Sequence, residues 1–170
     1  MIKSGIEVEQ ITSKFALLRL FIQQSAKIGR LNIHKDCEGL IMRMLNLAYG
    51  YKLVNLNEDK NSFPAVDLGE LGKIAFQVTS EKTSDKVNQT LNQVLNHSLF
   101  SLYPSINIFI VGTKQTSYSI NTNTLPSFEF SYKKNILDFD DLLKKIAHSE
   151  PEAISSILLL LEQELPNIFE

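Results

Sequence analysis

The stretch Lys73-Ile-Ala-Phe-Gln-Val-Thr79 decides the predicted fold. Large apolar residues alternate in it with small or polar ones, which is the two-residue period of a β-strand with two unlike faces. The apolar residues 62–68 precede it, and the turn sequence Gly69-Glu-Leu-Gly72 lies between the two stretches. This arrangement predicts a β-hairpin.

The register of this hairpin determines the surroundings of Asp67. If Asp67 pairs with Ala75, then Asp67, Gln77 and Thr79 share one face of the sheet. A shift by one residue would place Asp67 among the large apolar residues instead. The sequence leaves both registers open.

The rest of the chain adds helices and two further strands. A helix is predicted near residues 83–100, a buried strand at 106–111, a polar loop at 113–126 and a half-exposed strand at 127–132. We also expect a short strand at 51–56 and helices near 6–30, 36–49, 138–148 and 152–165, with Gly29, Asp36 and Gly50 as helix-end signals. This order predicts an α/β fold in one domain, residues 1–170, with a small mixed β-sheet flanked by helices and extra C-terminal helices.

Composition excludes several classes of protein. A chain of 170 residues that is 44% hydrophobic can bury a core, so disorder and fibrous repeats are excluded. The formal net charge of −2 gives no global attraction to nucleic acid, and the single Cys37 excludes a disulfide framework. Because no apolar run is long enough for a signal peptide or a membrane span, we expect a soluble, cytoplasmic protein that binds no membrane.

Three charged residues lie where core building does not explain them. Glu38 borders the apolar arc of the helix at 36–49. There a carboxylate is either paired, hydrogen-bonded or bound to a metal, or it simply reaches solvent or bonds a helix end. Asp67 ends an apolar stretch before a glycine turn, where it either has a functional role or forms an Asx-turn. Lys86 falls in the first turn of the helix at 83–100, with Lys82 just upstream. Two lysines at a helix start could bind phosphate, or both could simply be solvated.

Together these residues fit the hydrolysis of a phosphodiester. Carboxylates hold a divalent cation in such sites, and a nearby lysine stabilises the charge that develops on the phosphate. Nucleotide-binding glycine motifs and a Gly-x-Ser-x-Gly motif are absent from the sequence. The leucine run 158–161 predicts either an oligomer or partner contact, such as a homodimer, or ordinary core packing.

Several motifs in the same order resemble the SMEK domain, a bacterial module linked in several proteins to anti-phage conflict systems. They are Asn32-Ile-His34, Glu38 followed by Met44-Leu-Asn-Leu-Ala-Tyr-Gly50, Leu53-Val-Asn-Leu-Asn57, Asn61-Ser-Phe-Pro-Ala-Val-Asp-Leu-Gly69 and Ile74-Ala-Phe-Gln-Val-Thr-Ser80. The resemblance spans residues 5–115. Residues 116–170, predicted to form a strand and C-terminal helices, show none.

The SMEK domain in turn resembles the PD-(D/E)xK superfamily of restriction-endonuclease-like folds. That pattern takes a Glu from a helix, an Asp from the second strand and a (D/E/Q)-x-K from the third, and Glu38, Asp67 and Gln77 match it. Thr79 stands where the lysine belongs, so Lys86, or less directly Lys82, would replace it.

The resemblance therefore implies a magnesium- or manganese-dependent nuclease acting on DNA in an anti-phage or conflict system. Asp67, Glu38 and Gln77 would be the metal ligands, and Lys86 and Lys82 would contact the substrate phosphate. The alternative is a catalytically inactive nuclease-like fold that serves as a protein- or nucleic-acid-binding or assembly module in such a system, with a protein partner in a defence complex.

Overall fold

The computed structural model describes residues 2–30, 33–58, 63–121 and 129–165, and the chain divides into two compact units. The helical unit comprises Met1–Tyr51 and Phe139–Glu170, and the sheet unit comprises Lys52–Asp138.

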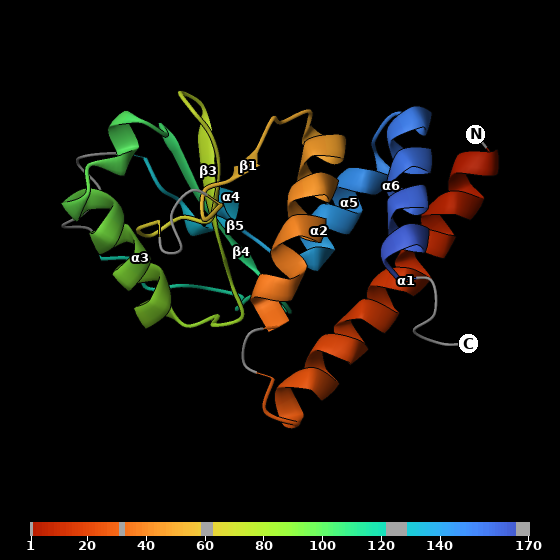
Figure 1. Ribbon diagram of the computed structural model, residues 1–170, viewed down its shortest axis with the longest axis horizontal. Helices are drawn as coiled ribbons and strands as arrows, with labels where there is room; N and C mark the ends of the chain where they lie inside the picture. The colour runs from red at the N-terminus through yellow and green to blue at the C-terminus, as the bar shows by residue number, and fades with distance from the viewer. Residues whose placement is uncertain (1, 31–32, 59–62, 122–128, 166–170) are drawn as a thin grey trace. The chain divides into compact units, whose positions relative to one another are not determined.

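The sheet unit contains an open, mixed sheet of five strands in the order β1-β2-β3-β4-β5 (Figure 1). Its first three strands run antiparallel, and β4 and β5 continue parallel to β3. The strands are β1 (Val54–Asn55), β2 (Leu68–Glu70), β3 (Ile74–Thr79), β4 (Ser105–Ile110) and β5 (Ile136–Leu137). The expected mixed α/β architecture, with helices flanking the sheet, is confirmed.

The hairpin forms, but its first strand begins later than predicted. β2 pairs Gly69 with Ala75, so neither of the two registers that the sequence left open is found, and Asp67 lies two residues beyond the first of them. A two-residue shift keeps the same face, because side chains alternate with a period of two. The segment before β2 is irregular because Pro64 lacks a backbone N–H and Ala65 has a φ of +65°. The Val66 amide donates to the Pro64 carbonyl at 2.8 Å and tightens this bend.

Gly69 lies inside the strand for a packing reason. A Cβ atom at this position would lie 2.8 Å from Cε1 of Tyr103 and about equally close to a leucine side chain. The bare backbone therefore lets the tyrosine ring pack directly on β2.

Helix α3 (Ser84–Asn96) covers one face of this sheet, and the 3-10 turn η1 (Leu99–Ser101) follows it. Val87, Leu91 and Val94 of α3 belong to one buried cluster with Ala75 of β3 and the isoleucines of β4. The small residues of β3 therefore face a helix, and their size lets the helix approach closely.

Two predictions for the later part of the sheet unit are wrong. Residues 129–131 form no strand, and Tyr132–Asn135 form the short helix α4; residues 127–128 of the expected strand lie outside the described residues. The fifth strand is instead Ile136–Leu137, in a stretch that was expected to be a connection. The strand expected at 51–56 shortens to β1.

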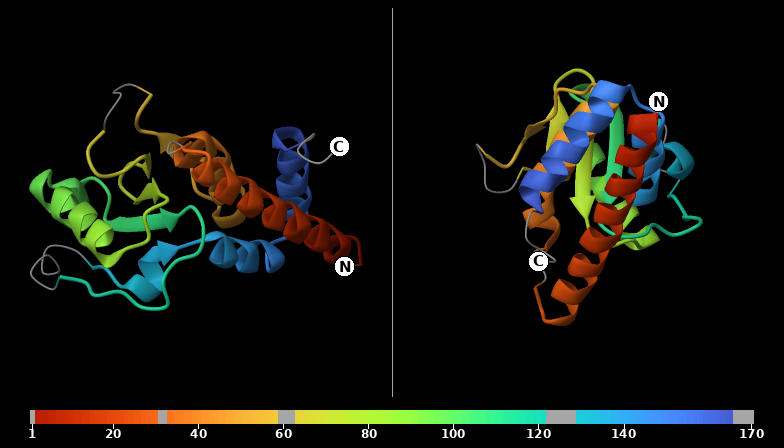
Figure 2. Two further views of the ribbon diagram at one scale, coloured as in Figure 1. Left: turned by 90° about the horizontal axis from the view of Figure 1, so that it is seen from below. Right: turned by 90° about the vertical axis from the view of Figure 1, so that its right-hand side faces the viewer.

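The helical unit consists of α1 (Ile2–Lys27), α2 (Ile33–Tyr49), α5 (Phe139–Ala147) and α6 (Pro151–Glu164). Helices α1 and α6 lie side by side (Figure 2). Asp36 does not cap α2 as expected, because the helix begins at Ile33 and the Asp36 carboxylate accepts a hydrogen bond from Arg30.

The leucine run of α6 contributes mainly to the core of this unit. Leu158, Leu160 and Leu161 are buried, whereas Leu159 is 55% exposed. Ordinary core packing therefore accounts for three of the four leucines. No described helix combines the length and the apolar character that crossing a bilayer requires.

Candidate functional site

The carboxylate of Asp67 lies against the backbone of the neighbouring strand β3. Its Oδ2 accepts a hydrogen bond from the Val78 amide at 2.8 Å, and its own backbone amide donates to the Phe76 carbonyl at 2.8 Å. Asp67 therefore bonds across to β3 and does not form the Asx-turn that was the alternative prediction. These bonds place the carboxylate against the backbone of the residue that follows Gln77.

Asn57 holds the other oxygen of this carboxylate. Asn57 Nδ2 donates to Asp67 Oδ1 at 3.1 Å, while Asn57 Oδ1 accepts from the Phe63 amide at 2.9 Å. The Asn57 amide itself donates to Asn55 Oδ1. The Asn57 side chain thus orients Asp67. The sequence Leu53-Val-Asn-Leu-Asn57 contains this residue but gives no sign of the role.

Gln77 connects β3 to helix α3. Its Oε1 accepts a hydrogen bond from the Thr90 hydroxyl, which also lies 3.1 Å from the Lys86 carbonyl oxygen. A hydroxyl has a single proton. If that proton goes to the carbonyl, rotating the Gln77 amide by half a turn lets its NH₂ group donate to Thr90 instead. Thr90 was also missed, although its spacing from Val87, Leu91 and Val94 places it on the buried face of α3.

The start of α3 follows the prediction more closely. Thr83 is the N-cap, and its hydroxyl accepts from the Lys86 amide at 3.2 Å. Lys86 is half-buried, whereas Lys82 is exposed on the segment before the helix. Thr79, in the position where the motif carries a lysine, is only 6% exposed, and its hydroxyl accepts from the Glu81 amide.

Glu38 lies in α2 of the helical unit, whereas the other expected site residues lie in the sheet unit. It is 7% exposed, so the alternative in which this side chain reaches solvent is wrong. In the sheet unit, Asp67 bonds to the Val78 amide, the residue after Gln77, and Gln77 bonds to Thr90, one turn after Lys86 in α3. The joint ligand set of Glu38, Asp67 and Gln77 stays a prediction.

Among the described residues, no group of three or more His, Cys, Asp or Glu side chains could hold a metal ion. Asp67 and Gln77 alone supply one carboxylate and one amide. Both are oxygen donors of the kind that Mg²⁺ accepts, but a magnesium site made from them would need further ligands from water or substrate.

Two further groups have shifted pKa values without forming a reactive site. Burial raises the pKa of the Cys37 thiol to about 11, with a smaller contribution from the Asp36 carboxylate. Burial also raises the pKa of Tyr49 to about 12, and Tyr51, which stacks on its ring, adds to the effect. Cys37 is therefore a protonated core residue at neutral pH, since the thiolate is the reactive form of cysteine.

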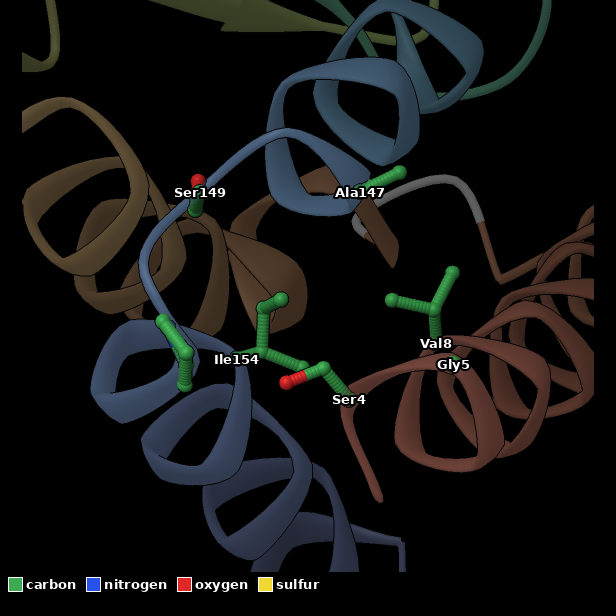
Figure 3. A pocket seen from close by; sticks show the side chains of 7 residues that line it. Ser4, Gly5, Val8, Ala147, Ser149 and Ile154 are labelled. Atoms are coloured by element: carbon green, nitrogen blue, oxygen red, sulfur yellow. The ribbon is translucent and has the colours of Figure 1, made fainter. Parts of the chain in front are cut away.

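The helical unit also contains a cavity of about 420 Å³ between α1 and the α5–α6 connection (Figure 3). Its lining has no ionisable side chain and consists of Ser4, Gly5, Val8, Ala147, Ser149, Pro151 and Ile154. Such a lining offers no acid, base or nucleophile for catalysis beyond two serine hydroxyls without a basic partner in the lining.

The fold and this arrangement define an α/β protein whose polar residues gather at one end of a mixed sheet. The family model of the SMEK domain matches residues 10–147, which is well over half of the chain. This chain belongs to the SMEK domain family. The match continues beyond residue 115, where the resemblance drawn from motifs ended. No curated protein and no solved structure matches the chain.

Proposed function

We propose that this protein is a metal-dependent nuclease domain with a restriction-endonuclease-like fold, which hydrolyses DNA phosphodiesters in a bacterial anti-phage or conflict system. The observation that carries the proposal is the contact of Asp67 with β3. Asn57 and the Val78 amide hold the Asp67 carboxylate, and Val78 follows Gln77 on the strand that bears the (D/E/Q)-x-K position of the nuclease pattern. The bacterial defence context rests on the family resemblance.

In this proposal Asp67 and Gln77 hold Mg²⁺ or Mn²⁺, and Glu38 is the second carboxylate that the resemblance implies. The cation would lower the pKa of a bound water and stabilise charge on the phosphate. Each Asp67 oxygen accepts one hydrogen bond from the protein, and a carboxylate oxygen has capacity for a second partner. The structural contacts of Asp67 are therefore compatible with metal binding.

The position of Lys86 supports its role as the substitute for the missing lysine. Thr90 contacts Gln77, and Lys86 lies four residues earlier on the same face of α3. Because a helix that connects two parallel strands runs back along them, four residues, about 6 Å, toward the start of α3 match two residues, about 6.6 Å, toward the end of β3. The same step along β3 leads from Gln77 to Thr79. Ideal geometry therefore puts the backbone of Lys86 in α3 at the same level as Thr79 in β3. Lys82 is the second candidate for contact with the phosphate.

The test is cleavage of plasmid DNA and of RNA in the presence of Mg²⁺ or Mn²⁺. Replacing Asp67 alone also removes a structural acceptor, so the informative variant combines Asp67→Asn with Asn57→Asp, which exchanges the two groups and preserves their hydrogen bonds. We expect DNA cleavage by the wild type, loss in the exchanged variant, and unchanged activity in Asp85→Asn, a control that removes an exposed carboxylate from α3. Equal cleavage by the wild type and the exchanged variant would exclude Asp67 as a ligand, and absence of cleavage of either nucleic acid would exclude the nuclease proposal.

A second candidate is a catalytically inactive module that binds nucleic acid or a protein partner. Two observations favour it: Thr79 is buried in the lysine position, and the described residues hold no cluster of three metal-binding side chains. A cation that binds only the folded state raises the melting temperature. A rise with Mn²⁺ that is lost in the exchanged variant supports the nuclease, whereas an unchanged melting temperature supports the inactive module.

A further inference from the structure

Helix α1 has a second row of mostly apolar residues on the side opposite its buried one. Its buried side consists of Ile11, Phe15, Leu18, Ile22 and Ser25. On the other side, residues recur every three or four positions, which keeps them within an arc of about 80° because each helical residue turns by about 100°. We call this row the outer stripe, and its members are Ile2, Ile6, Gln10, Ser13, Leu17, Leu20, Gln24 and Ile28.

The outer stripe is accessible along its whole length. Leu17 is half-buried, and the other members are exposed. The two isoleucines at its ends are the most open, with Ile2 84% and Ile28 78% exposed. Ile28 directly follows the last residue of α1, and its amide still donates to the Gln24 carbonyl at 3.2 Å. Exposed apolar residues are common one at a time, but a row of them along about seven helical turns indicates an interaction surface.

Charge indicates the kind of partner. The charged residues of α1 all lie outside the arc of the outer stripe and are Lys3, Glu7, Glu9, Lys14, Arg19 and Lys27. The polar members of the stripe are Gln10, Ser13 and Gln24, and each of these side chains can both donate and accept a hydrogen bond. Two copies of this surface therefore meet without charge repulsion, and their polar residues can pair with one another. The outer stripe is complementary to itself.

The area of the outer stripe sets the strength of such a contact. Residues 2–28 span about 39 Å of helix, so a strip about 10–15 Å wide covers about 400–600 Å² on each copy. Two copies together bury about 800–1,200 Å², which is the size of weak, reversible protein contacts and smaller than that of permanent ones. We expect a dissociation constant in the micromolar range.

We propose that the outer stripe is the contact surface of a homodimer, in which α1 of one copy packs against α1 of a second copy. In a two-fold symmetric contact of this kind each pair of residues occurs twice. The rival surface is the exposed leucine of α6, but Leu159 stands alone. One turn away from it the exposed residues are Ser156, Glu162 and Gln163. The proposal depends neither on metal binding nor on nuclease activity.

The test is sedimentation equilibrium of the wild-type chain between about 1 and about 500 μM, a range that brackets a micromolar dissociation constant. We expect a mass near 19.3 kDa at the lowest concentration and a rise toward twice that mass at the highest. A wild type that stays monomeric over the whole range would overturn the proposal. Because the measurement contains no divalent cation and no nucleic acid, its failure is separate from any failure of cleavage.

Leu20→Glu is the decisive variant, because Leu20 is 47% exposed and its replacement leaves the buried side of α1 intact. Burying the exposed half of a leucine on both copies strengthens the dimer about tenfold to hundredfold, so we expect the variant to weaken it by at least that factor. Ile6→Glu repeats the test nearer the start of the helix. Gln23→Glu is the matched control, since it adds the same charge at an exposed position of α1 outside the outer stripe, and it should change the dissociation constant less than about twofold.

Leu159→Glu tests the rival surface on α6. Weaker dimers of Leu20→Glu and Ile6→Glu, with Gln23→Glu and Leu159→Glu as dimeric as the wild type, support the proposal. A dimer that is lost in Leu159→Glu but kept in Leu20→Glu would move the contact to α6 and overturn it. Equal weakening by Leu20→Glu and Gln23→Glu would show a general effect of charge and would also overturn it. Far-UV circular dichroism checks that each variant is folded.

Discussion

The replacement of Asp67 by Asn should destabilise the fold, whatever its effect on activity. In the native protein both carboxylate oxygens act as acceptors, one for the Asn57 amide group and one for the Val78 backbone amide. An asparagine side chain at position 67 keeps only one acceptor, because its other terminal atom is an NH₂ donor. One of the two native donors then faces another donor.

The magnitude follows from the half-buried position of this site. A hydrogen bond to a charged acceptor contributes about 1.5–3 kcal/mol when well shielded, and leaving a buried donor unsatisfied costs about 1–3 kcal/mol. Because Asp67 is only partly buried, we expect a loss of about 1–2 kcal/mol. For a chain of this length the melting temperature should fall by about 2–8 °C.

Exchanging the two side chains should recover most of this loss. In Asn57→Asp with Asp67→Asn, the new carboxylate at position 57 accepts from the Phe63 amide and from the new amide group at position 67, whose oxygen accepts from Val78. Chemical unfolding followed by circular dichroism, for the wild type, both single variants and the double variant, gives the coupling energy, which we expect to be about 1–2 kcal/mol in favour of the exchanged pair. Single-variant effects that simply add would contradict the hydrogen bonding described for Asp67.

Other predictions concern the packing and titration of the same chain. Gly69→Ala should destabilise the fold by about 1–3 kcal/mol, because the new Cβ would meet a tyrosine ring. Gly39→Ala in α2 should be neutral or stabilising by up to about 1 kcal/mol, because its Cβ would meet only the end of an arginine side chain at 3.8 Å. Urea unfolding compares the two variants. Thr90→Val should lower the free energy of unfolding by about 1–2 kcal/mol, because it leaves the side-chain amide of Gln77 without its partner. An unchanged urea midpoint of unfolding would refute that contact. The pKa of the Cys37 thiol is about 11 in the folded protein, against an ordinary value of 9.0. Between pH 9 and pH 11 the unfolded chain therefore loses this proton while the folded protein keeps it. The free energy of unfolding should fall by about 1 kcal/mol from about pH 8 to about pH 10. Thermal melts of the wild type and Cys37→Ala should differ in this slope, and parallel curves would contradict the assignment.

The regular parts of the fold could be predicted from periodicity. Strand β3 alternates over six residues, and α3 repeats apolar side chains at helical spacing, so both elements lie where the sequence indicates them. Stretches without a period were less predictable. The apolar residues 63–67 have strand composition, but Pro64 and the left-handed Ala65 interrupt the ladder, and a conformation of that kind is not encoded in an alanine.

The fifth strand illustrates a second limit. Ile136 and Leu137 form only two residues of strand, and their pairing with Ile108 and Phe109 depends on a partner far away in the sequence. Two residues cannot display a period. The contact partners of the site residues were hidden for the same reason, because Asn57 and Asp67 stand ten positions apart in the sequence.

The contacts of Asp67 show why an unusual aspartate has to be tested for structure and chemistry separately. Accepting two hydrogen bonds requires acceptors in the correct places, and an amide and a carboxylate can share that task between positions 57 and 67 in either order. Binding a divalent cation requires the negative charge to face the metal. Only the arrangement with the carboxylate at position 67 meets this requirement. Stability should therefore depend on the pair of side chains at positions 57 and 67, whereas metal binding should require the carboxylate to be at position 67. A stable exchanged variant that no longer binds Mn²⁺ would separate the two roles of Asp67, and a stable variant that still binds Mn²⁺ would assign the metal to other residues.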